Sequence, residues 1–97
     1  MSVKITNANP RNGDENVPVF NGHITANGTV DEACTVSATL TDGVNPPVAG
    51  TPASMFVNAN QQWSFTFPVA ANTNYSLTVQ GTNAGGTGSS TITFKTA

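Results

Sequence analysis

Charged side chains are scarce in this sequence. They make up 8% of its 97 residues, against about 25% in an average soluble domain. The only basic residues are Lys4, Arg11 and Lys95, so there is no cluster of cations that could neutralise several phosphates, and we expect no nucleic-acid partner. Threonine and asparagine together supply 27 residues. A surface of such neutral hydrogen-bonding side chains favours an extracellular or cell-surface location.

Cysteine and long apolar runs are lacking as well. Cys34 is the only cysteine, which excludes an internal disulfide and a cysteine-based zinc site, because each needs more than one thiol. It begins an alternating apolar stretch, so we expect a buried and unreactive thiol. No apolar run approaches the roughly 20 residues of a membrane-spanning helix, and no signal-peptide pattern precedes the first expected strand. We therefore expect no membrane insertion, and we expect residues 1–97 to be one module of a longer polypeptide.

The groups that catalysis requires are also missing. His23 is the only histidine; it falls on the outward phase of an expected strand, and no Gly-x-Ser-x-Gly turn accompanies it, which argues against a serine triad. The carboxylates fall in expected loops rather than on a rigid cleft wall, so glycoside chemistry is not expected. Lys4 and Lys95 fall on outward phases, so a self-made isopeptide cross-link is not expected either. The sequence therefore predicts no enzymatic activity and no catalytic residue.

Alternation of apolar and polar residues is the main pattern that is present. Residues 62–68 place Trp63, Phe65 and Phe67 at every second position, which predicts a strand with one buried face. Residues 75–81 repeat the alternation, and no stretch shows a helical period. The two strands need apolar surfaces opposite them, so we expect two packed sheets, that is, a single all-β sandwich domain.

Turn-forming residues divide the chain into seven expected strands. These strands are residues 2–6, 17–26, 34–40, 53–57, 62–68, 75–81 and 91–95. We expect all of them to be antiparallel, with the first, second, fifth and fourth in one sheet and the third, sixth and seventh in the other. Residues 48–49 fit a short edge strand. Periodicity leaves open which of Met55, Phe56 and Val57 points inward.

The expected core gathers the inward residues of these strands. It consists of Trp63, Phe65, Phe67, Tyr75, Leu77, Val79, Val36, Leu40, Ile24, Phe20, Ile92 and Phe94. Because nearly all aromatic side chains take inward positions, the sequence offers no planar row of exposed rings of the kind that sugar-binding sandwiches use. Phe56 is the exception that the pattern leaves open.

Four segments carry a resemblance to a known family. In order they are Val17-Pro18-Val19, which follows Asn9-Pro10-Arg11-Asn12-Gly13, then Gln62-Trp63-Ser64-Phe65, Asn74-Tyr75-Ser76-Leu77-Thr78-Val79 and Gly85-Gly86-Thr87-Gly88-Ser89-Ser90-Thr91-Ile92. With this series the chain resembles the bacterial immunoglobulin-like (BIg-type) modules over nearly its whole length. The resemblance implies a seven-stranded antiparallel immunoglobulin-like β-sandwich without shared catalytic residues, and it puts Tyr75 at a tyrosine corner. The chain lacks an inter-sheet cysteine pair, so antibody-style recognition is not implied.

Modules of this family serve mostly as tandem stalks and spacers in adhesins, cell-surface proteins and secreted polysaccharide-degrading enzymes. The resemblance therefore implies a non-catalytic structural module, monomeric by itself, whose partners are the neighbouring domains of its polypeptide and, beyond these, surface glycan or protein. The alternative is a carbohydrate-binding or accessory module of a secreted polysaccharide-acting enzyme. An aromatic side chain exposed flat on the surface would favour that alternative.

Seven antiparallel strands place the two termini at opposite ends, which suits head-to-tail stringing, and they divide the acidic residues between those ends. Asp14, Glu15 and Asp42 fall at the C-terminal end, and Asp31 and Glu32 fall at the N-terminal end. Calcium takes about six to eight oxygens, and neither group matches a continuous calcium loop. Our hypothesis is that a tandem pair binds calcium at its junction, whereas the isolated module binds calcium weakly or not at all. No other cofactor is expected.

Overall fold

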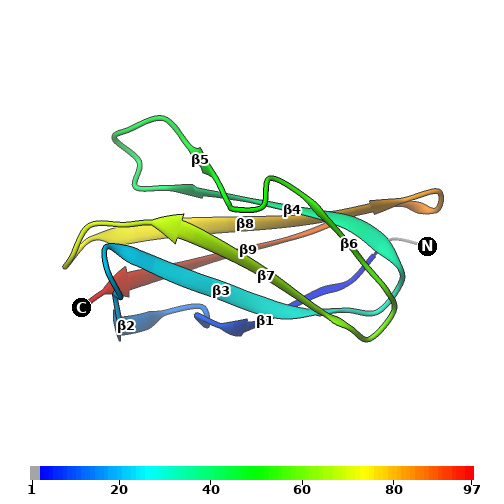
Figure 1. The fold of residues 1–97 in the computed structure, drawn as a ribbon, viewed down its shortest axis with the longest axis horizontal. Helices are drawn as coiled ribbons and strands as arrows, with labels where there is room; N and C mark the ends of the chain where they lie inside the picture. Colours follow the sequence, from blue (N-terminus) through cyan, green and yellow to red (C-terminus); the bar gives the residue numbers. More distant parts are fainter. Residues whose placement is uncertain (1–2) are drawn as a thin grey trace.

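The fold is built from strands (Figure 1). The computed structural model describes residues 3–97, and in that range it contains nine strands and no helix that is long and apolar enough to cross a membrane. In chain order the strands are β1 (Ile5–Asn9), β2 (Asp14–Val17), β3 (His23–Val30), β4 (Cys34–Thr41), β5 (Val48–Ala49), β6 (Met55–Val57), β7 (Gln62–Pro68), β8 (Asn74–Asn83) and β9 (Gly86–Thr96).

The strands form two sheets that face each other across the core (Figure 1). One sheet has the order β1-β3-β7, and the other has the order β2-β9-β8-β4, with β5 and β6 both paired to β4. The short edge strand expected at residues 48–49 is confirmed as β5. The expected sheet is wrong for residues 53–57, because β6 pairs with β4 instead of joining β3 and β7. The preceding segment does reach the other sheet, where Thr51 and Thr66 exchange backbone hydrogen bonds of 3.0 Å.

The orientation of the strands is mixed, because β2 runs parallel to β9. Gly13 N donates to Thr93 O at 2.7 Å, and Ala97 N donates to Val17 O at 2.9 Å. The prediction of seven antiparallel strands is therefore wrong in number and in orientation. Turn-forming residues at positions 9–16 conceal β2 in the sequence, and two of them, Gly13 and Asn16, adopt φ angles of 84° and 59°. Such left-handed positions let the chain bend from the first sheet to the second.

Phe20 is not a core residue: its side chain is 75% exposed. The expected strand 17–26 is interrupted by a two-residue turn, in which Asn21 and Gly22 have φ angles of 51° and 76°, as a type I′ hairpin requires. Phe20 and His23 exchange backbone hydrogen bonds of 2.9 Å in both directions across this turn. Residues paired in this way place their side chains on the same face. His23 points outward because its neighbour Ile24 points inward, and Phe20 therefore points outward too.

Strand β3 also continues to Val30, through residues that were expected to connect two strands. The asparagine and glycine at positions 27 and 28 suggest a turn, but Gly28 pairs with Trp63 of β7. A Cβ atom at Gly28 would collide with the Thr6 carbonyl oxygen and would lie 2.5 Å from Trp63 Cζ2. Glycine at this position therefore lets the Trp63 indole lie against the backbone of β3.

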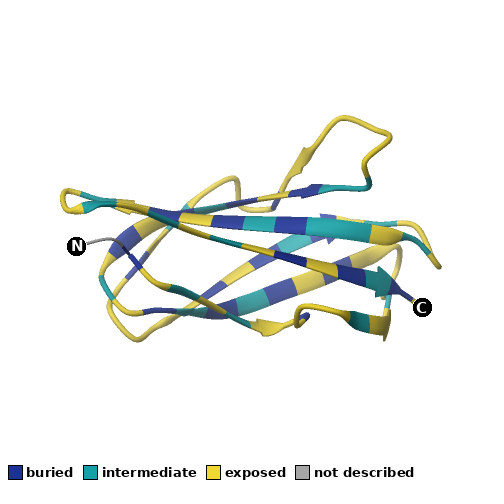
Figure 2. Cartoon of the chain, turned by 180° about the vertical axis from the view of Figure 1, so that it is seen from behind, coloured by how far each residue is buried: buried dark blue, intermediate teal, exposed yellow. Residues whose placement is uncertain are grey.

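The core lies between the sheets, so buried and exposed residues alternate along the strands (Figure 2). Trp63, Phe65 and Phe67 are fully enclosed, and the rings of Trp63 and Phe65 lie 6.0 Å apart. The other expected core residues are buried, except for Phe20 and for Tyr75, which is partly buried and packs against the core.

The three residues of β6 take three different environments. Val57 is buried, Met55 is partly buried against the core, and the side chain of Phe56 is 64% exposed. Because β6 is a short strand at the edge of its sheet, only one of its side chains reaches fully between the layers.

Candidate functional site

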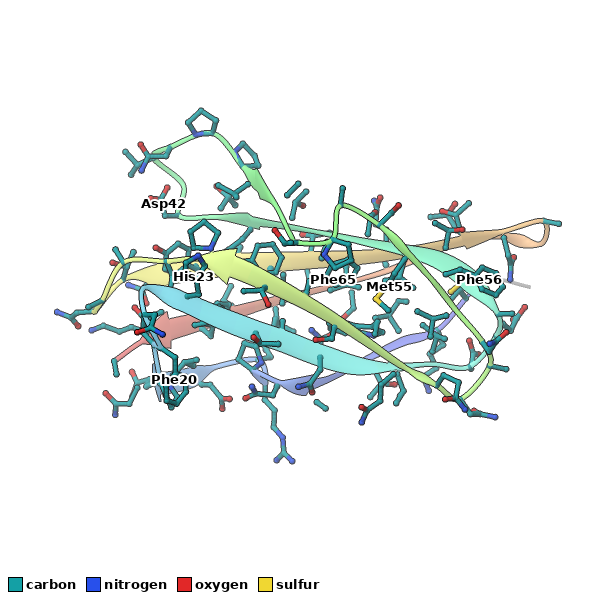
Figure 3. All side chains as sticks on the ribbon, viewed as in Figure 1. Phe20, His23, Asp42, Met55, Phe56 and Phe65 are labelled. Atoms are coloured by element: carbon teal, nitrogen blue, oxygen red, sulfur yellow. The ribbon has the colours of Figure 1, made fainter. Side chains whose placement is uncertain are left out.

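Three of the five acidic residues line one cleft, which we call the acidic cleft. It has a volume of about 300 Å³ and is lined by Asp14 and Glu15 of β2, by Asp42 after β4 and by Lys95 of β9. Lys95 belongs to the C-terminal end of β9, and Figure 3 shows Asp42 toward the same end of the molecule. The expected placement at the C-terminal end is therefore confirmed, but Asp14 and Glu15 lie in a strand and not in a loop.

Two of the carboxylates of this cleft, Asp14 and Asp42, accept hydrogen bonds from nearby residues. Asp42 Oδ1 accepts hydrogen bonds from Asn45 N and Val44 N, and Asp42 Oδ2 accepts one from Asn45 Nδ2, all at 2.8 Å. The backbone hydrogen bond from Asn45, followed by the others, lowers the pKa of Asp42. Asp14 Oδ2 accepts a hydrogen bond from Arg11 N at 2.9 Å. These oxygens stabilise turns, and a cation at the cleft would compete for them.

The other two acidic residues follow β3, and each accepts a hydrogen bond from a distant segment. Asp31 Oδ1 accepts a hydrogen bond from Lys4 N at 2.7 Å, and Glu32 Oε1 accepts one from Asn83 Nδ2 at 3.3 Å. Within residues 3–97, no group of three or more histidine, cysteine or acidic side chains is placed to hold a metal ion. Calcium binding at a junction between modules therefore stays a prediction.

Cys34 is buried, as expected. Burial raises the pKa of its thiol, and the charges of Asp31 and Glu32 raise it further. A thiol that stays protonated is a weak nucleophile. Cys34 therefore fits a packing role beside Gly81, where a Cβ atom would lie 3.0 Å from the cysteine Sγ.

A second cleft lies beside the turn that exposes Phe20, and we call it the Phe20 cleft. It has a volume of about 410 Å³, and the buried side chains of Val17 and Ile24 line it together with six others. These six are Asn9, Pro18, Phe20, His23, Thr25 and Asn27. The sequence pattern does not predict this cleft, because a continuous alternation places Phe20 in the core. The Asn-Gly pair at positions 21 and 22 is the signal that could have found it, since this pair strongly favours a two-residue hairpin.

His23 is exposed in this cleft, as its outward phase predicts. Its Nδ1 atom lies 2.9 Å from Asn21 O. A carbonyl oxygen can only accept, so Nδ1 donates this hydrogen bond and, in the neutral ring, Nε2 is left as an acceptor. Thr25 Oγ1 lies 3.2 Å from Thr66 Oγ1 and shares a hydrogen bond with it. The cleft thus combines an aromatic ring with an imidazole acceptor, a hydroxyl and two amides.

Comparison with known proteins shows a likeness of fold to a solved structure but no family. No protein-family model matches the chain, and no curated protein matches it. Among solved structures, the crystal structure of an engineered protein, at 1.98 Å resolution, is similar with a TM-score of 0.70 and 19% sequence identity. The match covers 99% of this chain and 20% of the engineered protein, so this chain spans about a fifth of its length. At that identity the likeness concerns the fold alone.

Proposed function

We propose that the chain is a non-catalytic structural module of a longer bacterial extracellular or cell-surface protein. It would act as a spacer that separates neighbouring domains and transmits tension between them. The observation that carries this proposal is the position of the first and last strands. Strand β1 begins toward one end of the long axis and β9 finishes at the other (Figure 1), and the extents of the molecule are 38 × 23 × 21 Å. Modules joined head to tail would add their long axes.

The immunoglobulin-like interpretation of the two sheets is part of this proposal. Ala70 N donates a hydrogen bond to Tyr75 Oη at 2.8 Å, and the Tyr75 ring stacks on Phe94 with a centroid distance of 5.8 Å. A tyrosine near the start of a strand that bonds back to the preceding connection is typical of the tyrosine corner in such sandwiches. The Tyr75 contact therefore supports the immunoglobulin-like interpretation, and it involves no catalytic or ligand-binding group.

The parallel pair β2 and β9 supports the proposed transmission of tension. Tension applied at the chain ends would pull β2 toward the N-terminal end through β1, and would pull β9 toward the C-terminal end. The two strands would therefore be loaded in opposite directions along their length, so that their hydrogen bonds share the load at the same time. Asn12 adds to this connection, because its Oδ1 atom accepts a hydrogen bond from Thr93 N at 3.0 Å.

Small-angle X-ray scattering of two copies fused head to tail tests the spacer function. We expect an elongated particle whose maximum dimension is close to twice the 38 Å length of one module. A single module measured alongside serves as the reference and is expected to be monomeric. A fused pair that folds side by side, with a maximum dimension close to that of one module, would contradict the proposal.

A further inference from the structure

Phe20 carries an exposed aromatic ring on a backbone that is held by pairing. Its backbone is paired with His23 by two hydrogen bonds of 2.9 Å across a two-residue turn, and the ring is 75% exposed. A single exposed apolar side chain is ordinary on a protein surface. Phe20 differs because it lines a cleft of about 410 Å³, and Figure 3 shows its side chain at the end of the molecule where β3 starts.

The polar groups of the Phe20 cleft lie in a line on one face of β3. His23, Thr25 and Asn27 occupy every second position of the strand, so their side chains share its outer face. Phe20 is paired opposite His23, and Asn9 of β1 is paired opposite Asn27. Asn9 Nδ2 donates one weak hydrogen bond to Thr25 O at 3.4 Å, which leaves its second N–H and its oxygen for a ligand.

The same neutral surface continues beyond the cleft onto β7. Thr66 is paired with Thr25, and Ser64 is paired with Asn27. Hydroxyl and amide groups therefore extend along and across the sheet from the Phe20 ring. None of the residues that line the cleft is acidic, and none is a lysine or an arginine. A charged ligand would find no counter-ion here, whereas a neutral ligand with many hydroxyl groups would find both donors and acceptors.

We propose that the Phe20 cleft binds a neutral polysaccharide. The C–H face of a sugar ring would stack on Phe20, because an aromatic ring offers an apolar face at a low cost in side-chain entropy. The sugar hydroxyls would bond to His23 Nε2 and to the Asn27 amide. A polymer is favoured over a single sugar because the hydroxyl and amide side chains continue past the cleft along β3 and β7. This binding goes beyond the spacer function and does not depend on it.

Affinity electrophoresis of the whole chain tests the proposal. Native gels would contain one of four neutral polymers, namely hydroxyethylcellulose, galactomannan, glucomannan or soluble starch, and a further gel would contain the charged polymer polygalacturonate. We expect retardation by at least one neutral polymer. Phe20→Ala should weaken this binding about tenfold or more, because an aromatic anchor at the centre of a contact carries much of its affinity. Phe56→Ala is the matched control, since Phe56 is also exposed, at 64%, but lies outside the cleft.

Two more variants separate ring stacking from simple apolar contact. Phe20→Trp keeps an aromatic face and should retain binding, whereas Phe20→Leu keeps apolar bulk alone and should lose it. Thermal melts of all variants should agree within a few degrees, because position 20 is exposed. The proposal is overturned if no neutral polymer retards the chain, if only polygalacturonate does, if Phe20→Leu binds as well as the wild type, or if Phe56→Ala weakens binding as much as Phe20→Ala.

Discussion

Replacing Trp63 with alanine is the most severe test of the packing that we describe. Trp63 is fully enclosed, and it is the largest of the fully buried side chains in the described part of the chain. Its indole fills the space over Gly28, and its Nε1 atom donates a hydrogen bond to Thr29 O at 3.3 Å. Removing the side chain therefore opens a cavity and takes away the partner of a carbonyl group.

The expected loss for Trp63→Ala is about 3 to 5 kcal/mol of unfolding free energy, as for other large-to-small changes of buried aromatic residues. A domain of this size has a total stability of about 5 to 15 kcal/mol, so the loss would take between about a fifth of this stability and nearly all of it. Urea unfolding measures the difference. With an m-value of about 1 to 1.5 kcal/mol/M, the midpoint should fall by about 2 to 5 M.

Phe56→Ala provides the matched control in the same assay. Phe56 is 64% exposed, so its removal should change the unfolding free energy by about 0.5 kcal/mol or less. A loss below about 1 kcal/mol for Trp63→Ala would refute the reasoning, because it would mean that the indole is not enclosed between the sheets.

Three further predictions concern Gly28, Asp42 and calcium. Gly28→Ala should lose about 2 to 3 kcal/mol of stability or more, because the added Cβ collides with the Thr6 carbonyl and the Trp63 ring; an unchanged urea midpoint would contradict this. Asp42 has a lowered pKa in the folded state, so its stabilising contribution is present above about pH 4 and is lost as the pH falls through that lowered pKa. Asp42→Ala should therefore lose less stability than the wild type between about pH 4 and pH 2, and parallel urea-midpoint curves for the two proteins would argue against it. Calorimetric titration of one module should show little or no calcium heat, whereas a head-to-tail pair should show calcium heat and a higher melting temperature; a pair without either response would rule out the junction site.

Strand bounds and core residues could be predicted from the sequence where apolar and polar residues alternate without interruption along a strand. Alternation gives the bounds of β7 at 62–68 correctly and places Trp63, Phe65 and Phe67 inside, because a strand with one buried face has only one way to pack that pattern. β4 follows the same rule and is one residue longer than expected, ending at Thr41.

The structure could not be predicted from the sequence where a local turn or the pairing of distant segments determines which residues form a strand and which way they point. Phe20 would point inward only if the strand were continuous from residue 17 to residue 26. The turn at Asn21 and Gly22 interrupts the strand, so Phe20 points outward. β2 could not be predicted, because its partner β9 lies almost at the other end of the chain and its residues resemble a loop. The Phe20 cleft depends on both features, since Val17 of β2 and the turn at Phe20 form parts of its lining.

Single-molecule stretching of the module by its two ends tests the central claim most directly. We expect Asn12→Ala to lower the mean unfolding force. Asn12 precedes β2 and accepts a hydrogen bond from Thr93 of β9, so it connects the two strands that are proposed to carry the tension. Asn45→Ala is the control: it also removes a side-chain hydrogen bond, to Asp42, but from a loop outside these two strands. A lower force for Asn12→Ala alone is the result that the account predicts. Equal forces for the wild type and Asn12→Ala, or an equal drop for both variants, would contradict it.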